Sequence, residues 1–271
     1  MHVLERWGIA FRHNPWLNRA DWLWDLVRPS YEKMVALFGQ NGLERIINGT
    51  DRILVLPRFR GVTETYEPEV WKHLMAQVQP GDIVADVGAF IGLYTIALAK
   101  RVGPSGKVVA FEPDPENFAA LKAHVELNRV ADRVELIQAA VGAQDGALPF
   151  EVGRGCESRI SHVLANGTQP ARCVRLDSAF AGRRLNMLKI DVEGYEEKVL
   201  KGAINLLQNG RRSPRVIYIE VHPYAWSAVR TSSESLLSLL ARCNYQTLQL
   251  DGQPAKQIEA WGEIVAHRND D

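Results

Sequence analysis

The chain has 271 residues, of which 46% are hydrophobic and 24% charged, a composition typical of a soluble globular protein. Its 32 basic residues balance 32 acidic ones, and no long basic run could follow a phosphate backbone, so we do not expect nucleic acid as a partner. Three scattered cysteines exclude a disulfide framework, and the N-terminus lacks the apolar run of a signal peptide or a spanning helix, so we expect a cytoplasmic protein.

Residues 1–78 differ from the rest of the chain, and we predict that they form a mainly helical extension with a helix at Tyr31–Leu37. Scattered tryptophans usually anchor packing, which favours an extra layer on the main domain. A lid, an oligomer contact such as that of a homodimer, and a membrane-surface helix remain alternatives. Four of the seven tryptophans lie in this extension: Trp7, Trp16, Trp22 and Trp24.

From residue 79 to residue 271 we predict one α/β domain. Short apolar runs alternate there with segments of helical period, which is typical of a doubly wound, mainly parallel sheet. The predicted strands are Ile83–Val87, Val108–Glu112, Val134–Ala139, Met187–Val192 and Val216–Val221. The predicted helices are Leu93–Arg101, Pro115–Asn128, Tyr195–Gln208 and Ser233–Cys243.

Two features interrupt this alternation. Residues 143–183 are rich in Gly, Asn, Ser and Arg, with strand-like pieces at Leu148–Val152 and Arg172–Leu176, and we interpret them as an insertion beside the active face. At the C-terminus, Tyr245–Leu250 and Gly262–His267 follow one another without a helix between them. This arrangement predicts an antiparallel pair at the end of the sheet.

The strongest local signal is the run from Pro80 to Gly92. It predicts a strand that ends in Asp86, a turn that carries Gly88 and Gly92, and a helix directly afterwards. Glycines in such a turn also occur in dinucleotide folds, but a carboxylate at Asp86 would repel a pyrophosphate. The same carboxylate suits the ammonium and sulfonium groups of S-adenosylmethionine.

Glu112 ends the next predicted strand, where a carboxylate can accept hydrogen bonds from both hydroxyls of a ribose. Alone it could be an ordinary surface acid at a strand end. Because Glu112 ends its strand as Asp86 ends the strand before it, next to the glycine turn, we expect it to make a second contact with the adenosyl cofactor. Ala139 to Val141, at the end of the third strand, would pass the adenine and offer mainly backbone groups.

Five motifs in this order resemble those of FkbM-family methyltransferases. They are Asp86-Val-Gly-Ala-Phe-Ile-Gly-Leu-Tyr-Thr95, Ala110-Phe-Glu-Pro113, Ala140-Val-Gly142, Leu188-Lys-Ile-Asp-Val-Glu-Gly-Tyr-Glu196 and Ile219-Glu-Val-His222, and together they cover roughly residues 65–221. The resemblance implies the class I, Rossmann-like methyltransferase fold: a seven-stranded sheet whose last strand runs antiparallel. It also implies S-adenosylmethionine as the cofactor and O-methylation of a sugar, glycan or natural-product hydroxyl.

Phe90 departs from the family pattern, which commonly has Asn in this turn. An Asn side chain could make polar contacts there that a Phe side chain cannot. Upstream, Tyr66 and Glu67 precede the helix that leads into the first strand, where a segment can cover the cofactor. The expected cofactor-binding residues are Asp86, Gly88, Ala89, Phe90, Gly92, Tyr94, Thr95, Glu112, Pro113, Ala140, Asp191, Tyr66 and Glu67.

The expected catalytic residues are Asp191, Glu193, Glu220 and His222, which follow or end two strands whose carboxyl ends face one edge of the sheet. An alcohol must lose its proton to accept a methyl group, and His222 is the favoured base because its ordinary pKa lies nearest neutrality. Asp191 and Glu193 either position the acceptor or, with His222, bind a divalent cation. We favour the former and assign no metal ligand.

Two other functions compete with this interpretation. An NAD-dependent oxidoreductase is disfavoured by Asp86 and by the missing middle glycine of the dinucleotide turn. A cofactor-binding protein without catalysis is suggested by Phe90 but disfavoured by the complete set of polar residues at the two strand ends. Binding of NAD would favour the first alternative, and turnover of any acceptor would exclude the second.

Overall fold

The structure, a computed structural model, describes residues 29–30, 41–151, 159–160 and 168–269. The helix predicted at residues 31–37 and the four N-terminal tryptophans lie outside the described residues, so the role of the extension stays a prediction. Within the described ranges, no helix is both long enough and apolar enough to cross a membrane.

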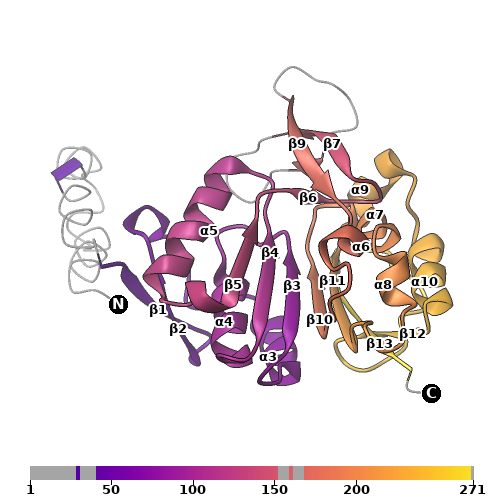
Figure 1. The fold of residues 1–271 in the computed structure, drawn as a ribbon, viewed down its shortest axis with the longest axis horizontal. Coiled ribbons are helices and arrows are strands. Elements are labelled where there is room, and N and C mark those ends of the chain that lie inside the picture. The colour runs from indigo at the N-terminus through magenta and orange to yellow at the C-terminus, as the bar shows by residue number, and fades with distance from the viewer. Residues whose placement is uncertain (1–28, 31–40, 152–158, 161–167, 270–271) are drawn as a thin grey trace, which may run out of the picture.

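A 7-stranded sheet forms the centre of the molecule, with the strand order β12-β13-β11-β10-β3-β4-β5 (Figure 1). Its parallel core consists of β3 (Ile83–Val87), β4 (Lys107–Phe111), β5 (Val134–Ile137), β10 (Met187–Ile190) and β11 (Val216–Val221). The last strand, β13 (Gly262–Arg268), runs antiparallel between β11 and β12 (Tyr245–Gln249). The predicted class I methyltransferase topology is therefore confirmed.

Helices cover both faces of this sheet, and each face has its own apolar core. One face packs against α3 (Pro68–Gln77), α4 (Leu93–Val102) and α5 (Pro115–Leu127). The other packs against α6 (Leu176–Ala179), α7 (Glu196–Lys201), α8 (Ile204–Leu207), α9 (Pro223–Trp226) and α10 (Ser233–Arg242). The described part also contains short 3-10 helices at Pro57–Phe59, Ala131–Arg133 and Ser227–Val229.

The single helix predicted at residues 195–208 is wrong, because α7 and α8 are separate. The interruption falls at Gly202 and Ala203. A Cβ added at Gly202 would lie 2.0 Å from the carbonyl oxygen of Gly142, so the chain here passes too close to a neighbouring segment for any side chain. The close approach ties these helices to the strand end that leads into the insertion.

Residues 43–55 form a β-hairpin, which differs from the mainly helical extension that we expected. β1 (Leu43–Ile47) pairs with β2 (Asp51–Val55) in an antiparallel 2-stranded sheet. Asn48 and Gly49 occupy the turn with φ of 50° and 72°, and Thr50 N–H donates to the carbonyl oxygen of Ile47. Positive φ at both central residues is the geometry that an Asn-Gly pair favours.

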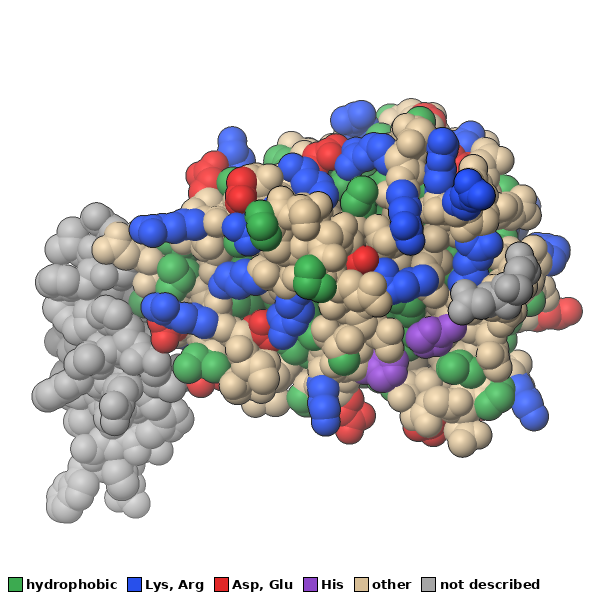
Figure 2. Space-filling model, turned by 60° about the horizontal axis from the view of Figure 1, so that its bottom comes forward, with side chains coloured by type: hydrophobic (Ala, Val, Ile, Leu, Met, Phe, Trp, Pro, Cys, Tyr) green, Lys and Arg blue, Asp and Glu red, His purple; other side chains and the backbone are tan. Residues whose placement is uncertain are grey.

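The insertion builds a small sheet above the carboxyl ends of the parallel strands (Figure 1). Its strand order is β6-β9-β7-β8, with β6 (Ala140–Val141), β7 (Gly146–Glu151), β8 (Arg159–Ile160) and β9 (Thr168–Val174). β7 and β9 overlap the two predicted strand-like pieces, although β9 begins earlier than predicted. The opposite, amino-terminal end of the parallel strands is tilted toward the viewer in Figure 2, where Lys and Arg side chains are spread over many elements.

Candidate active site

A pocket opens at the carboxyl ends of β3, β4 and β10, where the strand order reverses. Open α/β sheets bind their ligands at such a reversal. The volume of the pocket, including its open mouth, is about 730 Å³. It is lined by Tyr66, Val87, Gly88, Phe90, Phe111, Glu112, Pro113, Asn117, Ala139, Ala140, Val141, Phe150, Asp191, Val192 and Glu193.

Glu112 follows β4 and places a buried carboxylate in the pocket wall. Its Oε2 accepts a hydrogen bond from the backbone N–H of Phe90 at 2.9 Å, and its Oε1 accepts one from the backbone N–H of Asp114 at 2.8 Å. Burial raises the pKa of Glu112 to about 7, although the two N–H donors oppose that shift. Above this pH the side chain is an anchored anion that can accept hydrogen bonds from ligand hydroxyls.

Phe90 lines the same pocket with its backbone in the left-handed region, at φ 50°. Asn tolerates this conformation better than Phe does, which gives the departure from the family pattern a backbone cost. The backbone N–H of Phe90 nevertheless donates to Glu112, so the turn is held without a polar side chain at this position.

Asp86 lies in β3, directly before the pocket-lining residues Val87 and Gly88, and does not itself line the pocket. It is fully buried, and its Oδ2 accepts a hydrogen bond from Thr95 Oγ1 at 2.6 Å. Its Oδ1 has no hydrogen-bond partner among the described residues. Burial raises the pKa of Asp86, and nearby Lys189 opposes that shift. An orphaned buried carboxylate oxygen calls for a donor such as a ligand ammonium or a water molecule.

Gly88 and Gly92 are required by the protein's own packing. Both have positive φ, 84° and 92°. A Cβ added at Gly88 would lie 1.8 Å from the backbone oxygen of Asp191, and one at Gly92 would lie 2.5 Å from Leu121 Cδ1. Both glycines are among the expected cofactor-binding residues, but only Gly88 lines the pocket. Gly92 instead lets α5 pack against the start of α4.

The segment before α3 closes one side of the pocket with Tyr66. The hairpin turn holds this segment, because Asn48 Oδ1 accepts from the backbone N–H of Tyr66 at 3.0 Å and Asn48 Nδ2 donates to its carbonyl oxygen at 2.6 Å. Glu67 points to Tyr94 instead, and its Oε2 accepts from the Tyr94 hydroxyl at 2.7 Å.

The structure therefore divides the expected cofactor-binding residues into two groups. Those that line the pocket are Tyr66, Gly88, Phe90, Glu112, Pro113, Ala140 and Asp191. Those that support its wall or floor without lining it are Glu67, Asp86, Ala89, Gly92, Tyr94 and Thr95.

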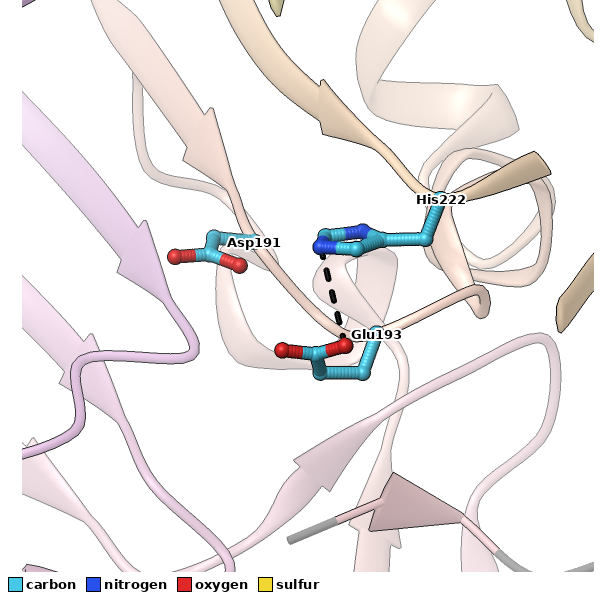
Figure 3. A group of neighbouring side chains, drawn as sticks. All are labelled: Asp191, Glu193 and His222. Carbon is cyan, nitrogen blue, oxygen red and sulfur yellow. Dashed lines mark ion pairs between the residues drawn. The ribbon is translucent and has the colours of Figure 1, made fainter. Parts of the chain in front are cut away.

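The four expected catalytic residues converge beside this pocket. Asp191, Glu193 and His222 each offer a ligand atom, and these atoms lie within 4.8 Å of one another (Figure 3). His222 Nε2 is 3.6 Å from Glu193 Oε2 and 3.7 Å from Glu220 Oε1. Burial raises the pKa of Glu220 to about 7, with a further upward contribution from Asp191.

The orientation of His222 depends on Glu196, a residue that the sequence did not single out. Glu196 is fully buried, and its Oε1 accepts from His222 Nδ1 at 2.8 Å. Its other oxygen accepts from Trp226 Nε1 at 2.8 Å. This contact makes Nδ1 the protonated nitrogen and directs Nε2 toward the carboxylates. Burial lowers the pKa of His222, but Glu196, Glu193 and Asp191 outweigh that effect and raise it overall.

Lys189 is a second residue that the sequence did not single out. Its buried Nζ donates to Asp191 Oδ2 at 3.2 Å and lies 4.6 Å from the centre of the Tyr94 ring. Burial lowers its pKa, but Asp191, Asp86 and Glu263 outweigh that effect, so the ammonium stays charged. Lys189 therefore links the floor beneath the pocket to the polar residues beside it.

Two large aromatic side chains are exposed next to these polar residues. The Tyr224 hydroxyl donates to Glu193 Oε2 at 2.6 Å, and Trp261 Nε1 donates to Glu220 Oε1 at 2.8 Å. Their exposed fractions are 65% and 63%, high for aromatic rings on a folded surface.

Several curated relatives are named as methyltransferases. Over 159 residues the chain is 26% identical to the hexuronic acid methyltransferase AglP of Haloferax volcanii, a match that covers 58% of this chain and 62% of that one. Over 161 residues it is 32% identical to the 31-O-demethyl-FK506 methyltransferase FkbM of Streptomyces tacrolimicus, covering 46% of this chain and 61% of that one. The chain thus spans about six-tenths of the length of these relatives.

Among solved structures, an FkbM methyltransferase from Methylobacillus flagellatus matches with a TM-score of 0.47 and 19% identity, covering 69% of this chain and 43% of that chain. The model of the methyltransferase FkbM domain matches residues 86–247, more than half of the chain. This range contains Glu112, Asp191, Glu193 and His222. The chain belongs to the FkbM methyltransferase family.

Proposed function

We propose that this protein transfers a methyl group from S-adenosylmethionine to a hydroxyl of a sugar, a glycan or a related polyhydroxylated metabolite. The observation that carries the proposal is that a pocket walled by Glu112 adjoins the converging side chains of Asp191, Glu193 and His222. A donor site and a proton-accepting group therefore lie side by side, as methyl transfer to an alcohol requires.

The residues of the pocket fit the cofactor. Glu112 accepts hydrogen bonds from the ribose hydroxyls, and the backbone from Ala139 to Val141 lies along the adenine. Asp86 Oδ1, buried and without a partner in the described residues, supplies a negative charge below the pocket for the ammonium group, directly or through a water molecule. When bound, S-adenosylmethionine supplies an electrophilic methyl group on a sulfonium.

On the acceptor side, Asp191 and Glu193 are shared between the pocket and the polar residues next to it. They hold the acceptor hydroxyl in line with the donor, and with no metal ion bound His222 Nε2 takes its proton. Glu196 keeps that nitrogen facing the acceptor. The bond from oxygen to the methyl carbon forms as the bond from carbon to sulfur breaks, and the proton ends on the imidazole.

The rim of the site supports the proposed acceptor class. Tyr224 and Trp261 present exposed rings whose polar atoms are tied to Glu193 and Glu220, so the rings are held in place beside the catalytic residues. Fixed aromatic surfaces next to hydrogen-bonding carboxylates suit a sugar ring, which has apolar faces and polar edges. The relative named as a hexuronic acid methyltransferase favours the same class.

Calorimetric titration with S-adenosylhomocysteine, in parallel with NAD, tests the donor site. We expect micromolar binding of the adenosyl ligand, at least tenfold weaker binding in Glu112→Gln and unchanged binding in the exposed control Glu116→Gln. A panel of hydroxylated sugars and polyols, followed by mass spectrometry for a gain of one methyl group, then tests transfer. Preference for NAD, or equal affinity in both variants, would contradict the proposed function.

A further inference from the structure

We propose that Asp191, Glu193 and His222 form a binding site for a divalent metal ion that holds the oxygen of the acceptor. The inference rests on the proposed function and specifies how the hydroxyl becomes reactive. The three side chains come from the ends of neighbouring strands and converge on one point (Figure 3). Two carboxylates and one imidazole are a donor set suited to Mn²⁺ and related first-row divalent ions.

The spacing of the three side chains leaves room for an ion. His222 Nε2 and Glu193 Oε2 lie 3.6 Å apart, whereas a charged hydrogen bond between them would close to about 2.7–2.9 Å. Ligand atoms at about 2.1 Å from one octahedral ion are roughly 3 Å apart when adjacent. Asp191 and Glu193, whose side chains are 28% and 29% exposed, can close the remaining distance around an ion.

Each of the three candidate ligands has a hydrogen-bond partner outside the group of three. Glu196 accepts from His222 Nδ1, which leaves the lone pair of the buried Nε2 directed into the site. Tyr224 donates to Glu193 Oε2, and Lys189 donates to Asp191 Oδ2. Metal-binding histidines usually donate their second ring nitrogen to a carboxylate, and ligating carboxylates are hydrogen-bonded in turn. A second layer of this kind distinguishes the site from an ordinary cluster of surface acids.

The charge of the site also favours a cation. Three carboxylates surround the imidazole, those of Asp191, Glu193 and Glu220. Buried Lys189 offsets part of this negative charge through its ion pair with Asp191. Three protein ligands leave positions open on an ion, as in catalytic metal sites. An acceptor hydroxyl in one of these positions would lose its proton near neutral pH, and the proton would pass to Glu220. The ion then replaces the free imidazole as the activating group.

Mn²⁺ is the probe for this site, because free Mn²⁺ gives a six-line electron paramagnetic resonance spectrum that disappears on binding. We expect one ion per chain in protein first treated with EDTA, and at least tenfold weaker binding in Glu193→Gln and Asp191→Asn. Glu126→Gln, an exposed acid in α5, which packs on the opposite face of the sheet from α7 and α9, is the matched control and should bind like the wild type. Melting temperatures with and without Mn²⁺ should show ion-dependent stabilisation in the wild type that is reduced in both site variants.

The outcome separates this inference from the proposed function. Stoichiometric Mn²⁺ binding that depends on Asp191 and Glu193, together with methyl transfer that stops in EDTA and returns with Mn²⁺, would support both. Failure of Mn²⁺ to bind, or equal binding in all variants, would overturn the metal site. If S-adenosylhomocysteine still binds and methyl transfer continues in EDTA, the metal site is rejected while the proposed function stands, with His222 acting as the free base.

Discussion

Cofactor affinity should depend on pH through Glu112. The ribose hydroxyls are hydrogen-bond donors, so they bind the carboxylate form of this side chain more tightly than the protonated form. Burial raises the pKa of Glu112 to about 7. Affinity is therefore full above pH 7 and is lost as the pH falls through that value. With one proton to displace, the dissociation constant should be about tenfold larger at pH 6 than at pH 8.

Titration calorimetry with S-adenosylhomocysteine at pH 6, 7 and 8 measures this effect without turnover. Glu112→Gln cannot titrate, and it replaces a charge-assisted hydrogen bond worth roughly 1.5–3 kcal/mol by a neutral one worth about half as much. It should bind more weakly at pH 8 and with little dependence on pH. Comparison of the two proteins also removes any contribution from ionisation of the ligand itself.

Two results would refute the reasoning. A dissociation constant that is equal at pH 6 and pH 8 in the wild type would mean that Glu112 is not the ribose acceptor or that its pKa lies far from 7. A tenfold change that persists in Glu112→Gln would assign the titration to another group. Glu116→Gln, in the exposed first turn of α5, should reproduce the wild-type profile.

Three further predictions concern packing, stability and acceptor binding. Gly88→Ala should lower the free energy of unfolding, measured in urea, by about 3 kcal/mol or more, because its Cβ would lie 1.8 Å from a backbone oxygen. Gly49 also has positive φ but has open space around it, so Gly49→Ala should lower the same free energy by only about 1–2 kcal/mol. Burial lowers the pKa of His124, so below about pH 6.5 this side chain takes up a proton more readily in the unfolded chain than in the folded one. The free energy of unfolding should therefore fall as the pH drops below that value. In urea titrations, His124→Gln should show a smaller fall with pH than the wild type. Trp261→Ala should raise the acceptor KM about tenfold and leave calorimetric affinity for S-adenosylhomocysteine unchanged.

The central sheet could be predicted because its physical signals are local. A buried parallel strand is a short apolar run, and a carboxylate directly after such a run must lie at the carboxyl edge of the sheet. For this reason the sequence could place both acids at this edge of the sheet, where Glu112 lines the pocket and Asp86 lies buried next to it without lining it. The hairpin at residues 43–55 had an equally local signal, the Asn48-Gly49 pair between two alternating runs, which our prediction of a helical extension passed over.

The partners of the site residues could not be predicted in the same way. Glu196 stands in the first turn of a short helix, where an acid usually faces solvent and favours the helix dipole. Its role becomes visible only when the fold brings it to 2.8 Å from His222. Lys189 similarly occupies an otherwise apolar strand, and its partners Asp86 and Asp191 come from a neighbouring strand and from the end of its own. Such contacts depend on register between segments.

The strand order explains why the proposed donor and acceptor sides meet at the segment after β10. β3 and β4 carry the proposed cofactor wall, β11 carries Glu220 and leads into His222, and β10 lies between β3 and β11. The segment after β10 therefore belongs to both sides, and Asp191 and Glu193 are the residues on it that line the pocket and also face the imidazole. If β3 and β4 form the cofactor wall as proposed, an acceptor approaches from the β11 side, past Tyr224 and Trp261. Acceptor specificity should therefore change with these two aromatic residues, while donor affinity depends on Glu112.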